Sequence, residues 1–144
     1  IGYNFCFTEM QAAIGISQMK KLPIIIEKKK TIRDLYVDAL GSLSSQFVPV
    51  KSVTDCTPVY WFTSFLCDNK SDLVKYMRTC GIQTREFFYP LHDQPCYSNF
   101  DGILMPDSYS VSTDLFNRGV SLPSSYNLSE ESQMSVINKL QQWL

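Results

Sequence analysis

The sequence of 144 residues is 44% hydrophobic and 19% charged, a composition that predicts one folded domain, or one small domain with part of another. Its formal net charge of −1 gives no long-range field that would favour nucleic acid or an anionic membrane, and we expect neither as a partner. The longest apolar run, Leu22–Ile26, is much shorter than the roughly 20 residues of a membrane-spanning helix, so no such helix is predicted.

The first predicted element is a bent helical arm. Thr8 and Gln11 have the spacing of a capping box, in which Thr8 caps the helix and Gln11 returns to the cap amide. Pro23 cannot continue a helical ladder but suits the first position of a new helix, so we expect a second helix over Pro23–Leu40, stopped by Gly41. The inward stripe of this second helix is predicted to be Ile25, Ile32, Leu35 or Tyr36, and Ala39.

After a Ser-rich turn the pattern changes to short segments of alternating type, in the order β-β-α-β-α-β-α. This order predicts a small α+β domain with helices returning to a sheet. Ser71 and Ser129 are expected to cap helices, and Gly81 to end one. The inward residues of the last helix are predicted to be Met134, Ile137, Leu140 and Leu144. Strands are expected over residues 47–53, 58–67, 82–88 and 120–122, helices over 71–80, 110–117 and from 129, and irregular chain over 93–107.

Cysteine and histidine are the residues that would make a disulfide framework or a metal site. The five cysteines are widely spaced and odd in number, and the chain has a single histidine, His92. We therefore expect free thiols in a reducing cytoplasm, with no metal site.

Arg85, Tyr89 and His92 lie within eight positions of one another, where a predicted strand runs out into a loop. Loops that leave a scaffold often carry binding groups. The Arg85 fork suits a phosphate or a carboxylate, and Tyr89 and His92 suit a hydroxylated ligand. From the residues alone, ligand binding and a structural role are equally supported. The lysines at 20, 21, 28, 29 and 30, by contrast, are interpreted as a solvated helix face.

Asn4 precedes the first helix by a few residues. It is either a turn or capping residue, or an amide donor to an anion near the helix N-terminus. The sequence shows no Ser-His-Asp set, P-loop, dinucleotide glycine motif or paired carboxylates. Without precedent, the residues indicate a ligand-binding α+β domain and no particular reaction.

Three stretches in register carry a family resemblance. They resemble the DegT/DnrJ/EryC1/StrS aminotransferases, pyridoxal phosphate (PLP) enzymes that act on nucleotide-linked keto-sugars, and perosamine-synthase-like members most of all. The likeness covers essentially the whole chain. The stretches are Gly2-Tyr3-Asn4-Phe5-x-x-Thr8-x-x-Gln11-Ala12-Ala13-Ile14-Gly15, followed by Gln18–Pro23, then Thr84-Arg85-x-Phe87-Phe88-Tyr89-Pro90-Leu91-His92, and Ser121-Leu122-Pro123.

The resemblance implies the C-terminal part of a fold-type-I aminotransferase. Residues 1–46 would be the end of the large domain and the interdomain arm. Residues 47–144 would be the small domain, with a mostly antiparallel sheet covered by helices. The Schiff-base lysine would lie upstream, so this chain would hold no catalytic residue and be inactive alone. The whole protein would be a homodimer with shared active sites that moves an amino group, from glutamate, to a nucleotide-linked keto-sugar.

The resemblance also implies roles for particular residues. Asn4 would bind the phosphate of the PLP held by the partner subunit, and Tyr3, Arg85, Tyr89 and His92 would line the sugar-nucleotide pocket. The chain departs from the family motif at Cys6 and Phe7, where the family has arginine and methionine. Cys6 favours one alternative, a catalytically silent or regulatory homologue. A second alternative is a PLP-dependent sugar dehydratase of the same family, in which histidine replaces the upstream Schiff-base lysine.

Overall fold

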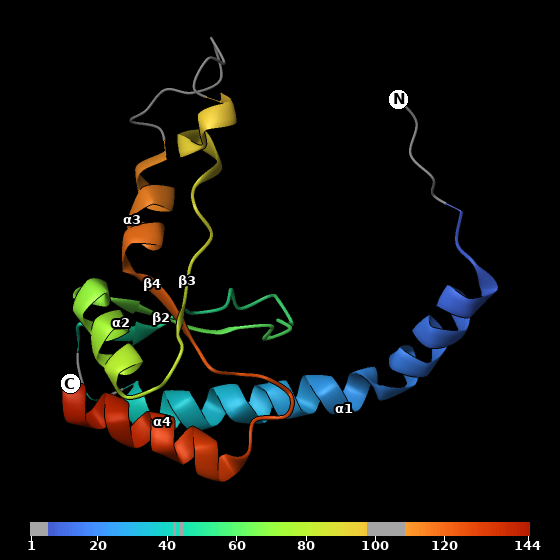
Figure 1. The fold of residues 1–144 in the computed structure, drawn as a ribbon, viewed down its shortest axis with the longest axis horizontal. Coiled ribbons are helices and arrows are strands. Elements are labelled where there is room, and N and C mark those ends of the chain that lie inside the picture. The colour runs from blue at the N-terminus through green and yellow to red at the C-terminus, as the bar shows by residue number, and fades with distance from the viewer. Residues whose placement is uncertain (1–5, 42, 44, 98–108) are drawn as a thin grey trace.

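The structure is a computed structural model that describes residues 6–41, 43, 45–97 and 109–144 (Figure 1). Tyr3 and Asn4 therefore lie outside the described residues. After the helical arm, the order of strands and α-helices is the predicted one. The elements are α1 (Glu9–Leu40), β1 (Phe47–Pro49), β2 (Thr63–Cys67), α2 (Lys70–Thr79), β3 (Arg85–Glu86), the 3-10 turns η1 (Leu91–Asp93) and η2 (Pro95–Tyr97), α3 (Ser110–Arg118), β4 (Gly119–Leu122) and α4 (Glu130–Trp143).

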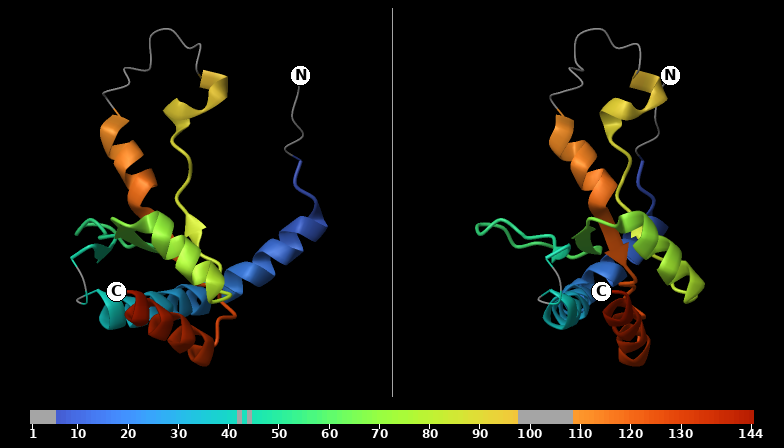
Figure 2. Two further views of the ribbon diagram at one scale, coloured as in Figure 1. Left: turned by 60° about the vertical axis from the view of Figure 1, so that its left-hand side comes forward. Right: turned by 90° about the vertical axis from the view of Figure 1, so that its left-hand side faces the viewer.

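The four strands form one antiparallel sheet in the order β1-β2-β4-β3. This confirms the predicted α+β class with an antiparallel sheet. Side chains alternate between the two faces of a strand, so Thr63, Phe65 and Cys67 of β2 are buried on the face that α1, α2 and α4 cover. Ser64 and Ser121 share the opposite face, with their hydroxyl oxygens 2.9 Å apart. Figure 2 shows α1 and α4 packed side by side on the helical side of the sheet.

Three of the described strands are shorter than predicted, whereas β4 begins one residue before its predicted start. Residues 58–67 contribute only Thr63–Cys67, and residues 82–88 only Arg85–Glu86. A β-rich composition describes side chains that fit a pleated surface, whereas a strand also needs a paired neighbour. The partner β4 is itself short, because Pro123 follows it and has no N–H to donate.

Helix α1 begins as predicted and does not break where predicted. Thr8 N–H donates to Gln11 Oε1 over 2.9 Å, and Gln11 N–H donates to Thr8 Oγ1 over 3.3 Å, so the capping box is present. The prediction of two helices meeting at Pro23 is wrong, since one helix runs through it. Proline removes one backbone hydrogen bond, and the bonds on either side are enough to continue the ladder with a bend. Figure 1 shows α1 changing direction in its N-terminal half.

The core lies between the sheet and helices α1, α2 and α4. On α1, Ile32 and Tyr36 are buried as predicted, and Leu40 is buried where Ala39 was expected. On α4, Ile137 and Leu140 are buried, but Met134 and Leu144 are exposed. Val136 and Gln133 take their places, and the Gln133 amide donates to the Ile32 carbonyl over 2.7 Å. The inward face of α4 is therefore turned by about one position from the prediction.

Three further residues were predicted to cap or end helices, and two of these predictions are confirmed. Ser129 caps α4 by accepting from the N–H of Ser132, and Gly81 follows α2 with a φ of 74°, as predicted. Ser71 does not cap α2, which begins one residue earlier after Asn69. No helix in the described part of the chain is long and apolar enough to cross a bilayer.

Thr63 has a buried hydroxyl whose Oγ1 finds no hydrogen-bond partner among the described residues. Its side chain is only 1% exposed. Valine has the same shape without the hydroxyl, so we expect Thr63→Val to raise the free energy of unfolding by about 1 kcal/mol, measured by urea denaturation.

A matched control is Ser64→Ala on the same strand. This change removes a hydroxyl that does have a partner, Ser121, and should lower the free energy of unfolding by about 1 kcal/mol. A loss of stability in Thr63→Val of the same size as in Ser64→Ala would contradict the assignment of Thr63 as an unpaired group.

Candidate functional site

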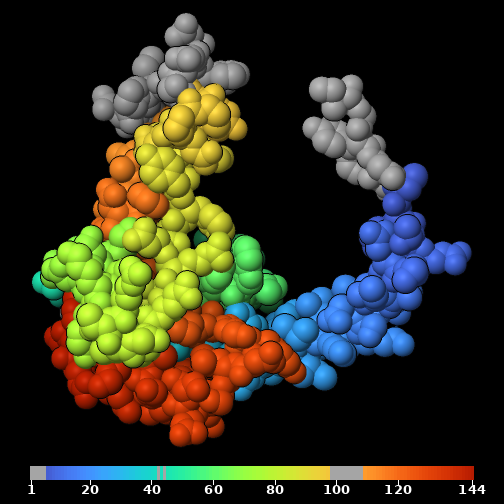
Figure 3. Space-filling model, in the orientation of Figure 1, coloured from blue at the N-terminus to red at the C-terminus, as the bar shows by residue number. Residues whose placement is uncertain are grey.

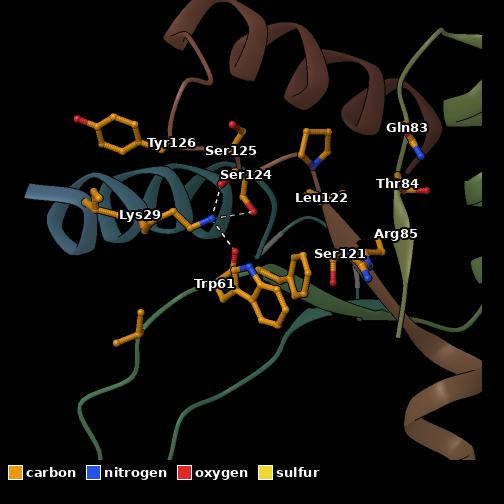
Figure 4. Close-up of a pocket in the computed structure, with 14 residues that line it drawn as sticks. Lys29, Trp61, Gln83, Thr84, Arg85, Ser121, Leu122, Ser124, Ser125 and Tyr126 are labelled. Carbon is orange, nitrogen blue, oxygen red and sulfur yellow. Dashed lines mark hydrogen bonds between the residues drawn. The ribbon is translucent and has the colours of Figure 1, made fainter. Parts of the chain in front are cut away.

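A groove of about 770 Å³ opens at the end of the sheet where β4 ends and β2 begins. Four segments line it: one turn of α1, residues 59–62, residues 83–85 and residues 121–126 (Figure 4). Its volume lies in the usual range for small-molecule sites, about 300–1,000 Å³. The groove is therefore the candidate site around which the chemistry-bearing residues are placed.

Lys29 joins three of these segments. Its ammonium Nζ donates to the carbonyl of Trp61 over 2.6 Å, and to the carbonyl and the hydroxyl of Ser124 (Figure 4). Partial burial lowers the pKa of Lys29, because water no longer fully solvates the charged form. The interpretation of Lys29 as part of a solvated face is wrong: its side chain anchors α1 to both loops at the groove floor.

The turn at Pro123 and Ser124 is held from two further directions. The Tyr36 hydroxyl donates to the Pro123 carbonyl over 2.9 Å, and the Thr63 N–H donates to Ser124 Oγ over 3.3 Å. Tyr36 is fully buried, and that burial raises its pKa, because the phenolate would have to exist out of water. The side of the groove formed by this turn is thus fixed by the core beneath it.

Arg85 reaches the groove from β3, where it pairs with Ser121 of β4. Its guanidinium carbon lies 5.0 Å from the centroid of the Phe62 ring and 5.4 Å from that of Phe88. Cation–π contacts of this kind hold a guanidinium in place while its N–H donors stay available. Among the described residues no carboxylate forms an ion pair with Arg85. The cation is therefore positioned and not neutralised within the described part of the chain.

Tyr89 lies beyond the end of β3 and does not line the groove. Its half-exposed ring meets Phe116 of α3 edge-on, with the centroids 5.1 Å apart. The Phe116 carbonyl accepts from Lys70 Nζ over 2.6 Å, and the same ammonium lies 4.7 Å from the Phe116 ring centroid. Lys70 thus holds the end of α3 against which Tyr89 packs.

His92 lies in η1 and also turns toward α3. Its Nε2 is 3.3 Å from Thr113 Oγ1 and 3.5 Å from Asp93 Oδ2, and its ring stacks on Tyr109 with centroids 4.8 Å apart. The side chain is only 11% exposed. The structure therefore brings Tyr89 and His92 to one segment along α3, and it places Arg85 apart from them in the groove.

Figure 3 shows the N-terminal half of α1 standing apart from residues 87–97, which follow β3, with a wide open hollow between them. The described residues contain no group of three His, Cys, Asp or Glu side chains placed to hold a metal ion. Tyr3 and Asn4, the two remaining candidates, belong to the undescribed start of the chain.

Two groove residues were missed by the sequence analysis. Trp61 lies within the strand predicted over residues 58–67, and nothing in its spacing marks it as exposed at a site. For Lys29 a signal was available, because it lies four residues after Ile25 and three before Ile32, on the stripe that faces the core.

Comparison with known proteins gives three consistent results. The family model of the DegT/DnrJ/EryC1/StrS aminotransferase family matches residues 1–141. The chain is 34% identical to EpsN of Bacillus subtilis over 97% of its own length, and 30% identical to the GDP-perosamine synthase of Escherichia coli O157:H7 over 99%. It spans only 37% and 38% of those two proteins.

Solved structures show the same fold. The crystal structure of DesV from S. venezuelae, in complex with a ketimine intermediate, matches with a TM-score of 0.88 at 21% identity, covering 99% of this chain and 38% of that one. Helicobacter pylori PseC, an aminotransferase involved in the biosynthesis of pseudoaminic acid, matches with a TM-score of 0.81 at 22% identity, with the same coverage.

Proposed function

The chain belongs to the DegT/DnrJ/EryC1/StrS aminotransferase family, and we propose that the whole protein transfers an amino group from glutamate to a keto-sugar carried on a nucleotide. The observation that carries this proposal is the family match over residues 1–141, which spans every motif that the family resemblance uses. Two relatives, from Escherichia coli O157:H7 and Vibrio cholerae, are named GDP-perosamine synthases, which supports a nucleotide-linked sugar as the substrate class.

This chain would supply the arm and the small domain of that enzyme, with the boundary at residues 46 and 47. The N-terminal half of α1 supports the role of an arm, because its large apolar residues are exposed on all sides of the helix, whereas the C-terminal half packs in the core of the small domain. Large apolar side chains gathered on an exposed surface usually mark an interaction site. We propose that the large domain and a second subunit cover it, as in a homodimer with shared active sites. The exposed residues are Met10, Ile14, Ile16, Met19, Leu22 and Ile24.

Pyridoxal phosphate is the cofactor of this proposal; when bound, it supplies the electron sink for amino transfer. The part of this chain that fits it is the start of α1. A helix N-terminus and the amide donors of Asn4 both suit a phosphate. We assign Asn4 to the phosphate of the cofactor in the partner subunit. None of the lysines in this chain stands in a family motif for the Schiff base, so we place that lysine upstream and expect the chain alone to be inactive.

The sugar nucleotide would be bound by Tyr3, Arg85, Tyr89 and His92. Arg85 is held between two aromatic rings with its donors available, an arrangement that suits a phosphate. The hydroxyl of Tyr89 and the imidazole of His92, which Thr113 orients, suit the sugar hydroxyls. The described cysteines form no disulfide with one another, which supports a reducing cytoplasm as the location.

The experiment that tests the proposal uses the whole protein. PLP is added, the sample is reduced with borohydride, and the modified residue is mapped by mass spectrometry. One modified lysine upstream of Gly2 is the expected result. The absence of any modified lysine would reject amino transfer. It would favour the silent homologue or the dehydratase. The observation on this chain that favours the silent homologue is Cys6, which is exposed where the family has arginine.

Asn4 offers a residue-level prediction in the whole protein. Asn4→Ala removes one hydrogen bond to the cofactor phosphate, so the PLP concentration for half-maximal activity should rise about 10- to 150-fold, since a hydrogen bond to a charged group contributes about 1.5–3 kcal/mol. The measurement is PLP titration of the apo form, with Asn127→Ala, on a turn before α4, as the control. An unchanged PLP requirement would remove Asn4 from the cofactor site.

A further inference from the structure

We propose that Trp61 is a stacking platform for the base of the nucleotide that carries the sugar, and that the groove beside it takes the nucleoside diphosphate. The inference rests on the proposed function, from which it takes the sugar nucleotide as substrate. To that function it adds one residue, Trp61, and one subsite, the groove. The starting observation is an aromatic ladder at the groove. Trp61 stacks on Phe62 with centroids 4.5 Å apart and an interplanar angle of 28°, and Phe62 in turn contacts the Arg85 guanidinium.

The indole is exposed although it is held. The residue is 66% exposed. Its backbone is held at both polar groups, because the Trp61 carbonyl accepts from Lys29 and the Trp61 backbone N–H donates to the Val59 carbonyl over 2.8 Å. Phe88 adds a second ring 6.5 Å away. A large ring whose backbone is fixed loses little conformational entropy when a ligand stacks on it. Every nucleobase has a flat π-face that stacks on such a ring.

The charge of the groove suits a diphosphate. Among its described lining residues two are basic, Lys29 and Arg85, and none is acidic. Lys29 already donates to the Trp61 and Ser124 carbonyls, which leaves Arg85 as the cation that can form a forked pair with phosphate oxygens. Thr84 and Tyr126 also belong to the lining, on opposite sides of the groove (Figure 4).

The size and shape also favour this occupant over the amino donor. Glutamate has no ring to stack and would leave the exposed face of Trp61 unused. A groove of about 770 Å³ is large enough for a base, a ribose and two phosphates together.

The test measures binding to the whole, PLP-loaded protein by calorimetry, with GDP, UDP and inorganic pyrophosphate as separate probes. Trp61→Leu should weaken the binding of GDP or UDP by roughly 5- to 150-fold and leave pyrophosphate binding unchanged, since it removes only the stacking. Trp61→Phe keeps a ring and should retain most of the affinity. Arg85→Gln should weaken the binding of all the probes that bind. Val53→Ala, an exposed residue on the same loop and outside the groove, is the control.

Three results would overturn the inference: no binding of either nucleoside diphosphate, equal affinities for the native protein and Trp61→Leu, or a Trp61→Leu effect confined to glutamate or PLP. Glutamate-dependent amination is measured in parallel. If the native protein aminates the sugar but Trp61→Leu binds the nucleotide as tightly as the native protein does, this inference is rejected and the proposed function is kept. Nucleotide binding that depends on Trp61, without amination and without a Schiff-base lysine, would reject the proposed function and keep the stacking site.

Discussion

Gly119→Ala is expected to lower the free energy of unfolding by about 3 kcal/mol, at the upper end of the cost of overpacking a core. A Cβ on Gly119 would lie 2.3 Å from the Phe87 ring and 2.5 Å from the Leu115 carbonyl oxygen. The ring can move, but the Leu115 carbonyl belongs to the last turn of α3 and accepts the Gly119 N–H. The clash therefore falls at the junction of α3 and β4, and urea denaturation measures it.

Gly15→Ala is the matched control for this prediction. Nothing lies within 4 Å of the position that its Cβ would take, and Gly15 is inside α1. The same substitution should there raise the free energy of unfolding by about 0.5–1 kcal/mol, because alanine favours a helix more than glycine does. Combining Gly119→Ala with Phe87→Ala should recover part of the loss through the ring contact. Equal and small effects at the two glycines would show that Gly119 is not packed as described.

The elements whose ends are set by local chemistry could be predicted from the sequence. The capping box at Thr8 and the Ser129 cap depend on side chains within a few residues of the bond they make. The lengths of the strands could not be predicted in this way, because they depend on which residues far along the chain supply a hydrogen-bonded partner. Pro123 limits β4, and β4 in turn limits β3, a relation that no local window contains.

In the candidate site, too, a residue in a local sequence pattern could be predicted, and a residue whose contacts are distant in the sequence could not. Arg85 could be selected from the sequence because an arginine at a strand exit is a local pattern. The structure places Arg85 on the lining of the groove, and its role in binding stays a prediction. Lys29 was missed because Lys28 and Lys30 beside it have the same chemistry, and only the helix register distinguishes them. Its partners, the Trp61 and Ser124 carbonyls, are 32 and 95 positions away along the chain. Only the folded structure brings these carbonyls to the Lys29 ammonium.

Tyr36→Phe is expected to change how stability depends on pH. The free phenol ionises near pH 10, and burial raises the pKa of Tyr36 in the folded state. Above pH 10 the unfolded chain loses this proton while the folded chain keeps it, so the unfolded state binds fewer protons and stability falls as pH rises. The Tyr36 contribution to this fall is about 1.4 kcal/mol per pH unit until the folded-state pKa is reached.

At neutral pH, Tyr36→Phe should cost about 1–2 kcal/mol, because the Pro123 carbonyl loses the hydroxyl that donates to it. Above pH 10 the difference from the native chain should shrink and then reverse, since phenylalanine cannot ionise. Urea denaturation at pH 7, 10 and 11 measures both effects, with Tyr126→Phe, an exposed tyrosine, as the control. A constant difference at all three pH values would mean that Tyr36 ionises in the folded state as readily as in the unfolded one. The Pro123 turn would then be open to solvent and not fixed by the core.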